Sequence, residues 1–476
     1  MATGFPRRWL LIVSPFIAIF FVYHFYLTPT SQPATQPITQ PPVAQNPPAP
    51  DHAPGQPKPN PVVGQEKPKV EPPPVEFASK EELCGNLPHD MDDVLVVLKT
   101  GATEALEKVP VHLRTTLQCV PHFAIFSDYE ETINGVRTQN VIRNVKPNTL
   151  QNEPEFGFYH RLQKVGREGL TEAEWGDHTN GPLGKVNNPG WKLDKWKFLP
   201  MVDKAFETMP KAKWFIFLEA DTYIVWQNVI TWLAHLDWNR PYYLGSPMQI
   251  GDMLFAYGGA GIILSQNAVQ QLHGYTASKQ EDLERMTAGE WAGDCALARA
   301  LGDLQIPLTW AWPMMLTSRP WELDHFSEGY GRQPWCYPVV SYHHMTEEDI
   351  DLMWHFDRGF FKSGKNALLL HGDVFRKLIH DQSLRQLDEW DNLAGTVIDF
   401  AAPTEPSLQA CAEVCARNSE CLQYTFNKND RVCKHSATAM RGIPSPGTQS
   451  GWMQFRIKKL LKSFQSSCGQ VEYIFE

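Results

Sequence analysis

Two acidic residues follow an apolar run near the middle of the chain. Residues 214–218 are all apolar, and Glu219 and Asp221 come directly after them, two positions apart. Such a run is typical of a buried strand, and ligands of open α/β sheets bind beyond the carboxyl ends of the strands. Two carboxylates at such an end can bind a hard divalent cation that bridges a diphosphate. By itself the pattern is weak evidence, because acidic residues at this spacing are common on solvated turns.

The residues on both sides of this pattern resemble glycosyltransferase family 31, in particular its core 1 β1,3-galactosyltransferase and Fringe-like branch. A helix bearing Lys and Trp comes first, and Trp214-Phe-Ile-Phe-Leu-Glu-Ala-Asp-Thr-Tyr223 is similar to the region around that branch's Asp-Asp-Asp-Thr-Tyr motif. Next, Pro241-Tyr-Tyr-Leu-Gly-Ser246 resembles the strand that follows, and Tyr257-Gly-Gly-Ala-Gly-Ile-Ile-Leu-Ser265 is similar to the family's Gly-Gly-Ala-Gly-Tyr-Val-Leu-Ser segment. The resemblance covers residues 94–344, and the order of the motifs carries it.

The resemblance implies a metal site and a general base. The segment around His343 and His344 is similar to the family's late Glu-His-His-Leu segment, where a His completes the metal site. We therefore expect Glu219, Asp221 and one of these two histidines to bind Mn²⁺ or another divalent cation, since an imidazole beside carboxylates suits manganese. Asp294 falls where the family carries its Glu-Asp-x-x-x-Gly motif, whose Asp is the proposed general base.

Further residues are expected to contact the nucleotide-sugar or the acceptor. Two pairs, at 100–101 and 127–128, qualify by their position at the carboxyl ends of adjacent strands. The glycines of the 257–265 segment permit close approach of the backbone where, in the family, donor and acceptor sugars meet. The expected contact residues are Thr100, Gly101, Ser127, Asp128, Lys195, Gly258, Gly259 and Gly261.

Alternating strand and helix patterns predict the scaffold that positions these residues. Residues 94–98 form an apolar run, residues 104–116 read as a helix, and residues 123–126 form the next apolar run. This order makes a βαβ unit, which predicts a parallel sheet covered by helices. Helical spacing also characterises residues 192–208, and helix-compatible spacing resumes over 224–236. The family implies an α/β fold with a GT-A-like nucleotide-sugar-binding sheet and helices on both faces.

The first part of the chain predicts a membrane anchor and a spacer. Residues 9–27 are mostly apolar and would span roughly 28 Å as a helix. Arg7 and Arg8 precede them, so the positive-inside rule keeps the N-terminus cytoplasmic and the rest in the Golgi or ER lumen. A cleaved signal peptide is the alternative, but the run is longer than usual and no small-x-small cleavage site follows it. Residues 28–75 contain 16 of the 38 prolines and no aromatic residue, which predicts an extended stem.

Four of the nine cysteines lie close together near the C-terminus. Cys411 and Cys415 are one helical turn apart, and Cys421 and Cys433 complete a pattern that resembles the PAN/Apple module. The module implies disulfides Cys411–Cys433 and Cys415–Cys421, in keeping with an oxidising lumen. Four cysteines can instead bind zinc, but paired Cys-x2-Cys knuckles are lacking. Such modules bind protein or carbohydrate, so this one either targets the enzyme to its acceptor or is a stabilising cap.

The remaining cysteines are odd in number, so at least one is free or joins two chains of a homodimer. They are Cys84, Cys119, Cys295, Cys336 and Cys468.

Length and charge limit the class of protein. A chain of 476 residues with 42% hydrophobic residues and 16 Trp can form one catalytic domain and a small module. A net charge of -10 argues against a nucleic-acid partner, which needs a basic face. The patterns divide the chain into a cytoplasmic tail (1–8), an anchor (9–27), a stem (28–78), a glycosyltransferase catalytic domain (79–398), a PAN/Apple-like domain (399–460) and a C-terminal tail (461–476).

Together these features predict a type II membrane glycosyltransferase. It would transfer a hexose, namely galactose, glucose or N-acetylglucosamine, from a UDP-sugar to a glycan or glycoprotein acceptor, with inversion and in β1,3 linkage. One alternative is a catalytically decayed, membrane-tethered protein that binds carbohydrate or protein. It is favoured by departures from the family, because Glu219 replaces Asp, Gly293 replaces Glu and Ala298 replaces Gly. Another is a transferase of a different family with the same sheet, in which the role of Asp294 would not hold.

Overall fold

The computed structural model describes residues 79, 83–84, 87, 89–175, 188–363, 368–380, 386–401, 403–465, 468, 471 and 473–475. The predicted cytoplasmic tail, membrane anchor and stem all lie outside these residues. Within the part of the chain that is described, no helix is both long and apolar enough to cross a membrane.

The catalytic part is built on an eight-stranded sheet with the strand order β11-β7-β10-β5-β1-β2-β4-β3. Its strands are β1 (Val94–Lys99), β2 (Phe123–Ser127), β3 (Thr132–Ile133), β4 (Val136–Asn140), β5 (Trp214–Glu219), β7 (Tyr243–Gly245), β10 (Ile262–Ser265) and β11 (Leu308–Trp310). β1 runs parallel to β2 and β5, so the carboxyl ends of these three strands lie at one edge. β10 runs antiparallel to β5 and β7, which makes the sheet mixed rather than parallel as predicted. The chain between β7 and β10 forms a hairpin instead of a crossover helix, so it returns in the opposite direction.

Helices follow most of the strands. They are α3 (Ala105–Arg114), α4 (Pro147–Asn152), α5 (Phe156–Val165), α6 (Pro189–Asp194), α7 (Phe198–Thr208), α8 (Trp226–Leu233), α9 (Gln266–Gly289), α10 (Gly293–Asp303), α11 (Glu347–Ser363) and α12 (His371–Val374). The single helix predicted over 192–208 is divided, because a 3-10 turn at Lys195–Lys197 separates α6 from α7. Asn188 caps α6 by accepting hydrogen bonds from the N–H groups of Gly190 and Trp191.

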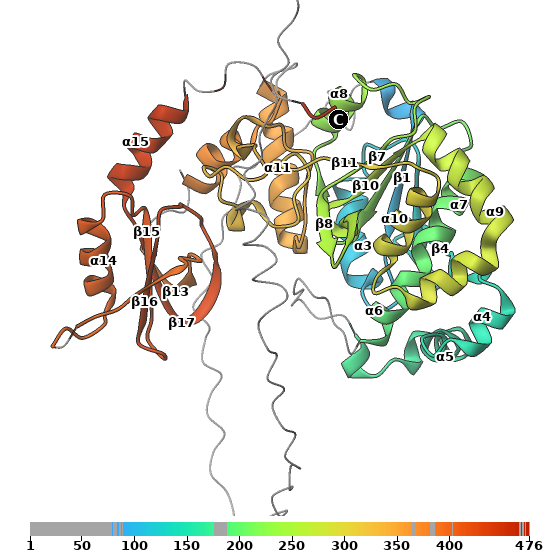
Figure 1. Cartoon of the computed structure of the whole chain (residues 1–476), viewed down its shortest axis with the longest axis horizontal. Coiled ribbons are helices and arrows are strands. Elements are labelled where there is room, and N and C mark those ends of the chain that lie inside the picture. Colours follow the sequence, from blue (N-terminus) through green and yellow to red (C-terminus); the bar gives the residue numbers. More distant parts are fainter. Residues whose placement is uncertain are drawn as a thin grey trace, which may run out of the picture. The chain divides into compact units, whose positions relative to one another are not determined.

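Successive residues of the central strands face two different cores. Val96 and Leu98 of β1 lie in one buried cluster with residues of α3, α8 and α11. Leu95 and Val97 lie in a second cluster with residues of α7, α9 and α10, which Figure 1 shows beside the sheet. Both faces are therefore covered, which explains why the strands are continuous apolar runs rather than alternating ones.

Two short antiparallel pairs complete the catalytic part. β6 (Tyr223–Ile224) pairs with β12 (Ser341–Tyr342), and β8 (Pro247–Ile250) pairs with β9 (Met253–Ala256) as a hairpin. The first pair joins segments more than a hundred residues apart, and each pair forms a two-stranded sheet of its own.

The C-terminal module has a separate five-stranded sheet with the order β13-β17-β15-β16-β14. Its elements are β13 (Leu387–Asp391), β14 (Thr396–Ile398), α14 (Leu408–Arg417), β15 (Gln423–Asn427), β16 (Val432–Ser436), β17 (Ile443–Trp452) and α15 (Gln454–Gln465). All strand pairs are antiparallel. Ser407 caps α14, because its side chain accepts the N–H of Ala410.

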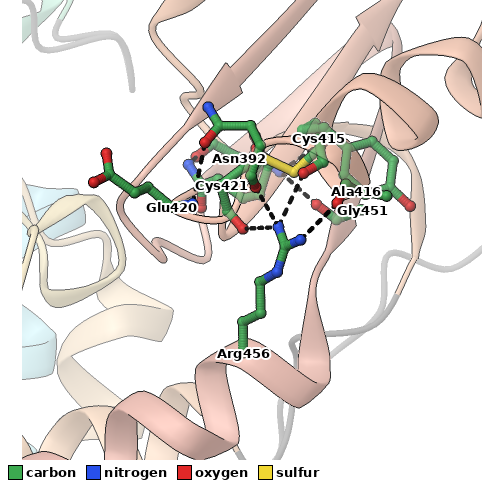
Figure 2. Close-up of a disulfide and its surroundings, with 10 residues drawn as sticks. Asn392, Cys415, Ala416, Glu420, Cys421, Gly451 and Arg456 are labelled. Carbon is green, nitrogen blue, oxygen red and sulfur yellow. Dashed lines mark hydrogen bonds between the residues drawn. A yellow bond between two sulfur atoms is a disulfide. The ribbon is translucent and has the colours of Figure 1, made fainter.

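Arg456 holds the end of α14 against α15. Figure 2 shows its guanidinium reaching from α15 to backbone carbonyls around the Cys415–Cys421 disulfide. It donates to the carbonyl oxygens of Cys415, Asn418 and Cys421 at 2.6–2.9 Å and to that of Ala416 at 2.7 Å. One half-buried cation therefore satisfies carbonyls of the last turn of α14 and of the loop that follows it.

Eight of the nine cysteines form disulfides. The pairs are Cys84–Cys119, Cys336–Cys468, Cys411–Cys433 and Cys415–Cys421. The last two pairs are the ones that the PAN/Apple resemblance implies. Cys295 is free and buried on α10, so the odd cysteine gives no support to a disulfide-linked dimer.

Candidate active site

The β6–β12 pair brings the acidic pattern and the histidine pair together. Ser341 lies opposite Ile224 and Tyr342 opposite Tyr223, so the next residue, His343, comes beside the turn that holds Asp221. His343 Nε2 lies 3.2 Å from Asp221 Oδ1. Ligand atoms of Asp221, His343 and His344 all lie within 4.8 Å of one another. The pairing of two short strands thus creates one cluster from residues 122 positions apart.

This cluster fits a divalent cation. The Nδ1 atoms of His343 and His344 are buried and have no hydrogen-bond partner among the described residues. The two rings lie with their centroids 3.9 Å apart, and His344 has a positive φ of 59°, a backbone conformation that few non-glycine residues adopt. Unpaired buried nitrogens are costly unless something binds them, so a carboxylate and two imidazoles would suit manganese or a similar metal.

Gly259 leaves the space that the His343 ring occupies. A Cβ atom at Gly259 would lie 2.2 Å from the ring, which is far closer than two carbon atoms can approach. Gly259 also accepts a hydrogen bond from the hydroxyl of Thr222, next to Asp221, at 2.7 Å. The glycine-rich segment therefore packs against the cluster of Asp221, His343 and His344 and helps to position it.

The charges around the cluster favour ligation at neutral pH. Burial by itself would raise the pKa of Asp221, but the charges of His343 and Lys108 hold it well below its usual range. Burial lowers the pKa of His344 to about 4, so this imidazole is neutral at pH 7. Burial also opposes the charge on His343, yet Asp221 raises its pKa. A cation that binds Asp221 would counter the negative charge that favours the proton on His343. Its binding would therefore release that proton and free the imidazole nitrogen as a ligand.

Glu219 is not part of this cluster, although the sequence predicts it as a metal ligand. Its Oε1 lies 3.1 Å from Lys99 Nζ, at the end of the neighbouring strand β1. The same ammonium group forms an ion pair with Asp194. Lys99 is 6% exposed and needs these counter-charges, which explains the position of Glu219.

Asp294 lies in the first turn of α10 and lines the same cavity as Asp221, His343 and His344. Its Oδ2 accepts the N–H of Gly258 at 3.0 Å, and its Oδ1 accepts the N–H of Cys295 at 2.9 Å. Burial raises the pKa of Asp294 to about 6, and the charge of Glu219 adds to the effect. A carboxylate of this pKa is ionised at pH 7 and is a better general base than an ordinary aspartate. At Gly293, a Cβ would lie 2.1 Å from the Phe198 ring, so the larger residue of the family does not fit.

The cavity has a volume of about 440 Å³. The predicted site residues that line it are Gly101, Lys195, Glu219, Asp221, Gly259, Asp294, His343 and His344. Those outside its lining are Thr100, Ser127, Asp128, Gly258 and Gly261.

Several of the residues outside the lining form contacts that position residues or loops of the cavity. Asp128 accepts the N–H of Ala102 at 2.8 Å and pairs with Lys197 Nζ at 2.9 Å, so it braces the loop after β1. Gly258 positions Asp294, and Gly261 has a φ of 89°, which a residue with a side chain rarely adopts.

Sequence reasoning predicted Lys195 but missed three other lysines of the cavity. Lys99, Lys108 and Lys197 all line it, and Lys108 Nζ lies 3.6 Å from Asp221 Oδ2 and 2.9 Å from Glu104. A signal was present, because Lys99 ends a fully buried strand and Lys108 stands four residues after Glu104 on the next helix. Acidic residues of the same lining counter these charges, since Lys99 pairs with Glu219 and Lys108 with Glu104.

Two family models match the chain. Residues 89–327 match the model described as Fringe-like, and residues 394–450 match the model of the PAN domain. No curated protein sequence matches the chain significantly. The family matches confirm both resemblances and fall on the two sheets described above.

Proposed function

The chain belongs to the Fringe-like family, which is a family of glycosyltransferases, and from this premise we propose a metal-dependent, inverting UDP-sugar transferase. It transfers a hexose, namely galactose, glucose or N-acetylglucosamine, to a glycan or glycoprotein acceptor, in β1,3 linkage. One observation carries the proposal: a carboxylate–imidazole cluster and a carboxylate with a raised pKa line one cavity.

The residues of the cavity divide the chemistry between them. A hydroxyl oxygen of the acceptor attacks the anomeric carbon of the donor, and its proton passes to a carboxylate oxygen of Asp294. The bond between the anomeric carbon and UDP breaks, and its electron pair leaves with the diphosphate. Attack from the opposite side in one displacement inverts the anomeric centre, so no covalent intermediate on the protein is needed.

Charge on the departing diphosphate is the main electrostatic problem of this reaction. A divalent cation held by Asp221, His343 and His344 would supply Lewis-acid stabilisation there. Lys108 lies beside Asp221 and has a raised pKa despite its burial, because Glu104 and Asp221 counter the loss of solvation. It remains charged at neutral pH and favours the same anionic leaving group.

Cellular location forms part of the proposal. The predicted anchor places a type II membrane protein in the Golgi or ER, with its catalytic part in the lumen. The four disulfides of the described residues support this location, since such bonds form in oxidising compartments. The PAN domain would bring the enzyme to its acceptor.

A decayed, carbohydrate-binding protein is the second candidate. The ion pair between Glu219 and Lys99 favours it, because it withdraws one of the acids expected at the metal.

Release of UDP from three donors tests the proposal. The purified chain is incubated with MnCl2 and UDP-galactose, UDP-glucose or UDP-N-acetylglucosamine. We expect metal-dependent turnover of one donor, its loss in Asp221→Asn, and loss of transfer with retained UDP binding in Asp294→Asn. Inertness toward all three donors with sugar binding intact would instead support the decayed protein.

A further inference from the structure

The lining of the active-site cavity is chemically mixed. It includes the candidate metal ligands and the lysines described above. It also includes apolar side chains, five of which we call the aromatic rim. These are Trp191, Met248, Ile250, Phe255 and Trp291.

Trp291 is the most exposed member of the rim. Half of its surface is open to solvent, and Ile250 is 46% exposed. The ring of Trp291 meets that of Trp191 edge to face, with centroids 5.6 Å apart. Large apolar side chains that line a cavity and remain this exposed mark a surface that a ligand covers.

The rim is fixed close to Asp294. Trp291 stands three residues before this carboxylate, so their Cα atoms lie at most about 11 Å apart. The contact of Gly293 with the Phe198 ring fixes the backbone between them. On the other side of the pair, the Asn188 side chain accepts the N–H of Trp191 at the start of α6. A ligand on the Trp291 ring therefore lies within reach of the proposed base.

From this arrangement we propose that the aromatic rim binds a neutral pyranose ring of the acceptor glycan, with Trp291 as its stacking platform. This inference rests on the proposed function and names the acceptor class of the same site. A pyranose presents a face of C–H groups to an aromatic ring and keeps its hydroxyl groups at the edge. None of the five rim side chains is charged, and the side chain of Gln249 in the cavity lining can form hydrogen bonds with hydroxyls.

Charge argues against an acidic sugar. Asp294 is ionised at pH 7 and follows Trp291 closely, so it would repel a carboxylate or sulfate on a sugar at the rim. The lysines that could compensate have partners of their own, since Lys99 pairs with Glu219 and Lys108 with Glu104.

Binding to an array of neutral and acidic oligosaccharides tests the proposal without requiring turnover. The purified full-length chain is applied with UDP and MnCl2 at pH 7. We expect binding to neutral glycans, and a loss of affinity on the order of 10- to 100-fold in Trp291→Ala with UDP affinity unchanged. Trp291→Phe keeps a ring and should recover most of the affinity, which a misfolded variant would not do.

Trp310 provides the matched control. It is 36% exposed and does not line the cavity, so Trp310→Ala should bind glycans as the unaltered chain does. Equal binding by Trp291→Ala, a preference for acidic glycans, or no glycan binding by the unaltered chain would each overturn the proposal. Glycan binding that depends on Trp291 without turnover of any UDP-sugar would overturn only the proposed function. Turnover with an unchanged acceptor KM in Trp291→Ala would overturn only the role of the rim.

Discussion

The raised pKa of Asp294 predicts how the rate depends on pH. Burial, helped by the negative charge of Glu219, raises the pKa of this carboxyl to about 6. The carboxylate accepts the proton of the acceptor, so protonation removes activity. We therefore expect the rate to be full above about pH 7 and to fall as the pH decreases through 6.

The size of the effect follows from the titration. With a pKa of 6, about 90% of the Asp294 side chains are ionised at pH 7 and about 10% at pH 5. The rate should fall about tenfold between these values. An aspartate with an ordinary pKa near 3.9 would lose less than about a tenth of its activity over the same range. The two cases are therefore easily distinguished.

Glu219→Gln tests the cause of the shift. This change removes a negative charge that raises the pKa of Asp294 and leaves Lys99 less neutralised, so both effects move the acid limb to lower pH. Initial rates of UDP release at saturating donor and MnCl2, measured between pH 5 and 8, give the profile. Glu207→Gln is the control, since Glu207 is 48% exposed and pairs with Lys204. A rate that does not change between pH 5 and 7 would refute the reasoning. So would a decrease in rate that occurs at the same pH in Glu219→Gln as in the unaltered chain.

Other consequences of the structure can be measured directly. His343→Ala should weaken Mn²⁺ binding by more than about tenfold, as read from the electron paramagnetic resonance signal of free Mn²⁺, and unchanged affinity would exclude this imidazole as a ligand. Gly259→Ala should weaken Mn²⁺ binding similarly, because the added methyl group collides with the His343 ring, whereas Gly274→Ala, with open space around its Cβ, should bind normally. Replacing Cys336 and Cys468 together by Ser should lower the free energy of unfolding by about 2–4 kcal/mol in urea titrations, and an unchanged unfolding midpoint would contradict a stabilising role for this bond.

Local patterns in the sequence predicted the main elements well. The apolar runs at 94–98, 123–126 and 214–218 became β1, β2 and β5. These features depend on neighbours in the chain, so the residues themselves encode them. The prediction of a parallel sheet is correct for β1, β2 and β5 but wrong for β10, because the Gly251-Asp252 turn before it forms a hairpin where a parallel strand needs a crossover helix.

Only the site residues that lie in recognisable family motifs could be predicted from the sequence. Asp221 and the two histidines of the late motif lie close together, yet the position of Glu219 depends on Lys99, a residue 120 positions earlier. No spacing rule reveals such an ion pair, since it arises from the register between β1 and β5. In the same way, Gly293 departs from the family because Phe198 fills the space beside it. Contacts between distant segments, rather than local preferences, decide these positions.

The bond between Cys336 and Cys468 closes a loop of the chain that contains the whole C-terminal module. Beyond it, the indole of Trp232 on α8 donates a hydrogen bond to the carbonyl of Ile474, so the last described residues return to the catalytic part. A protease that cuts between 380 and 400 would therefore yield two pieces that still migrate together on a gel until a reductant is added. The module is thus joined to the catalytic part at both of its ends.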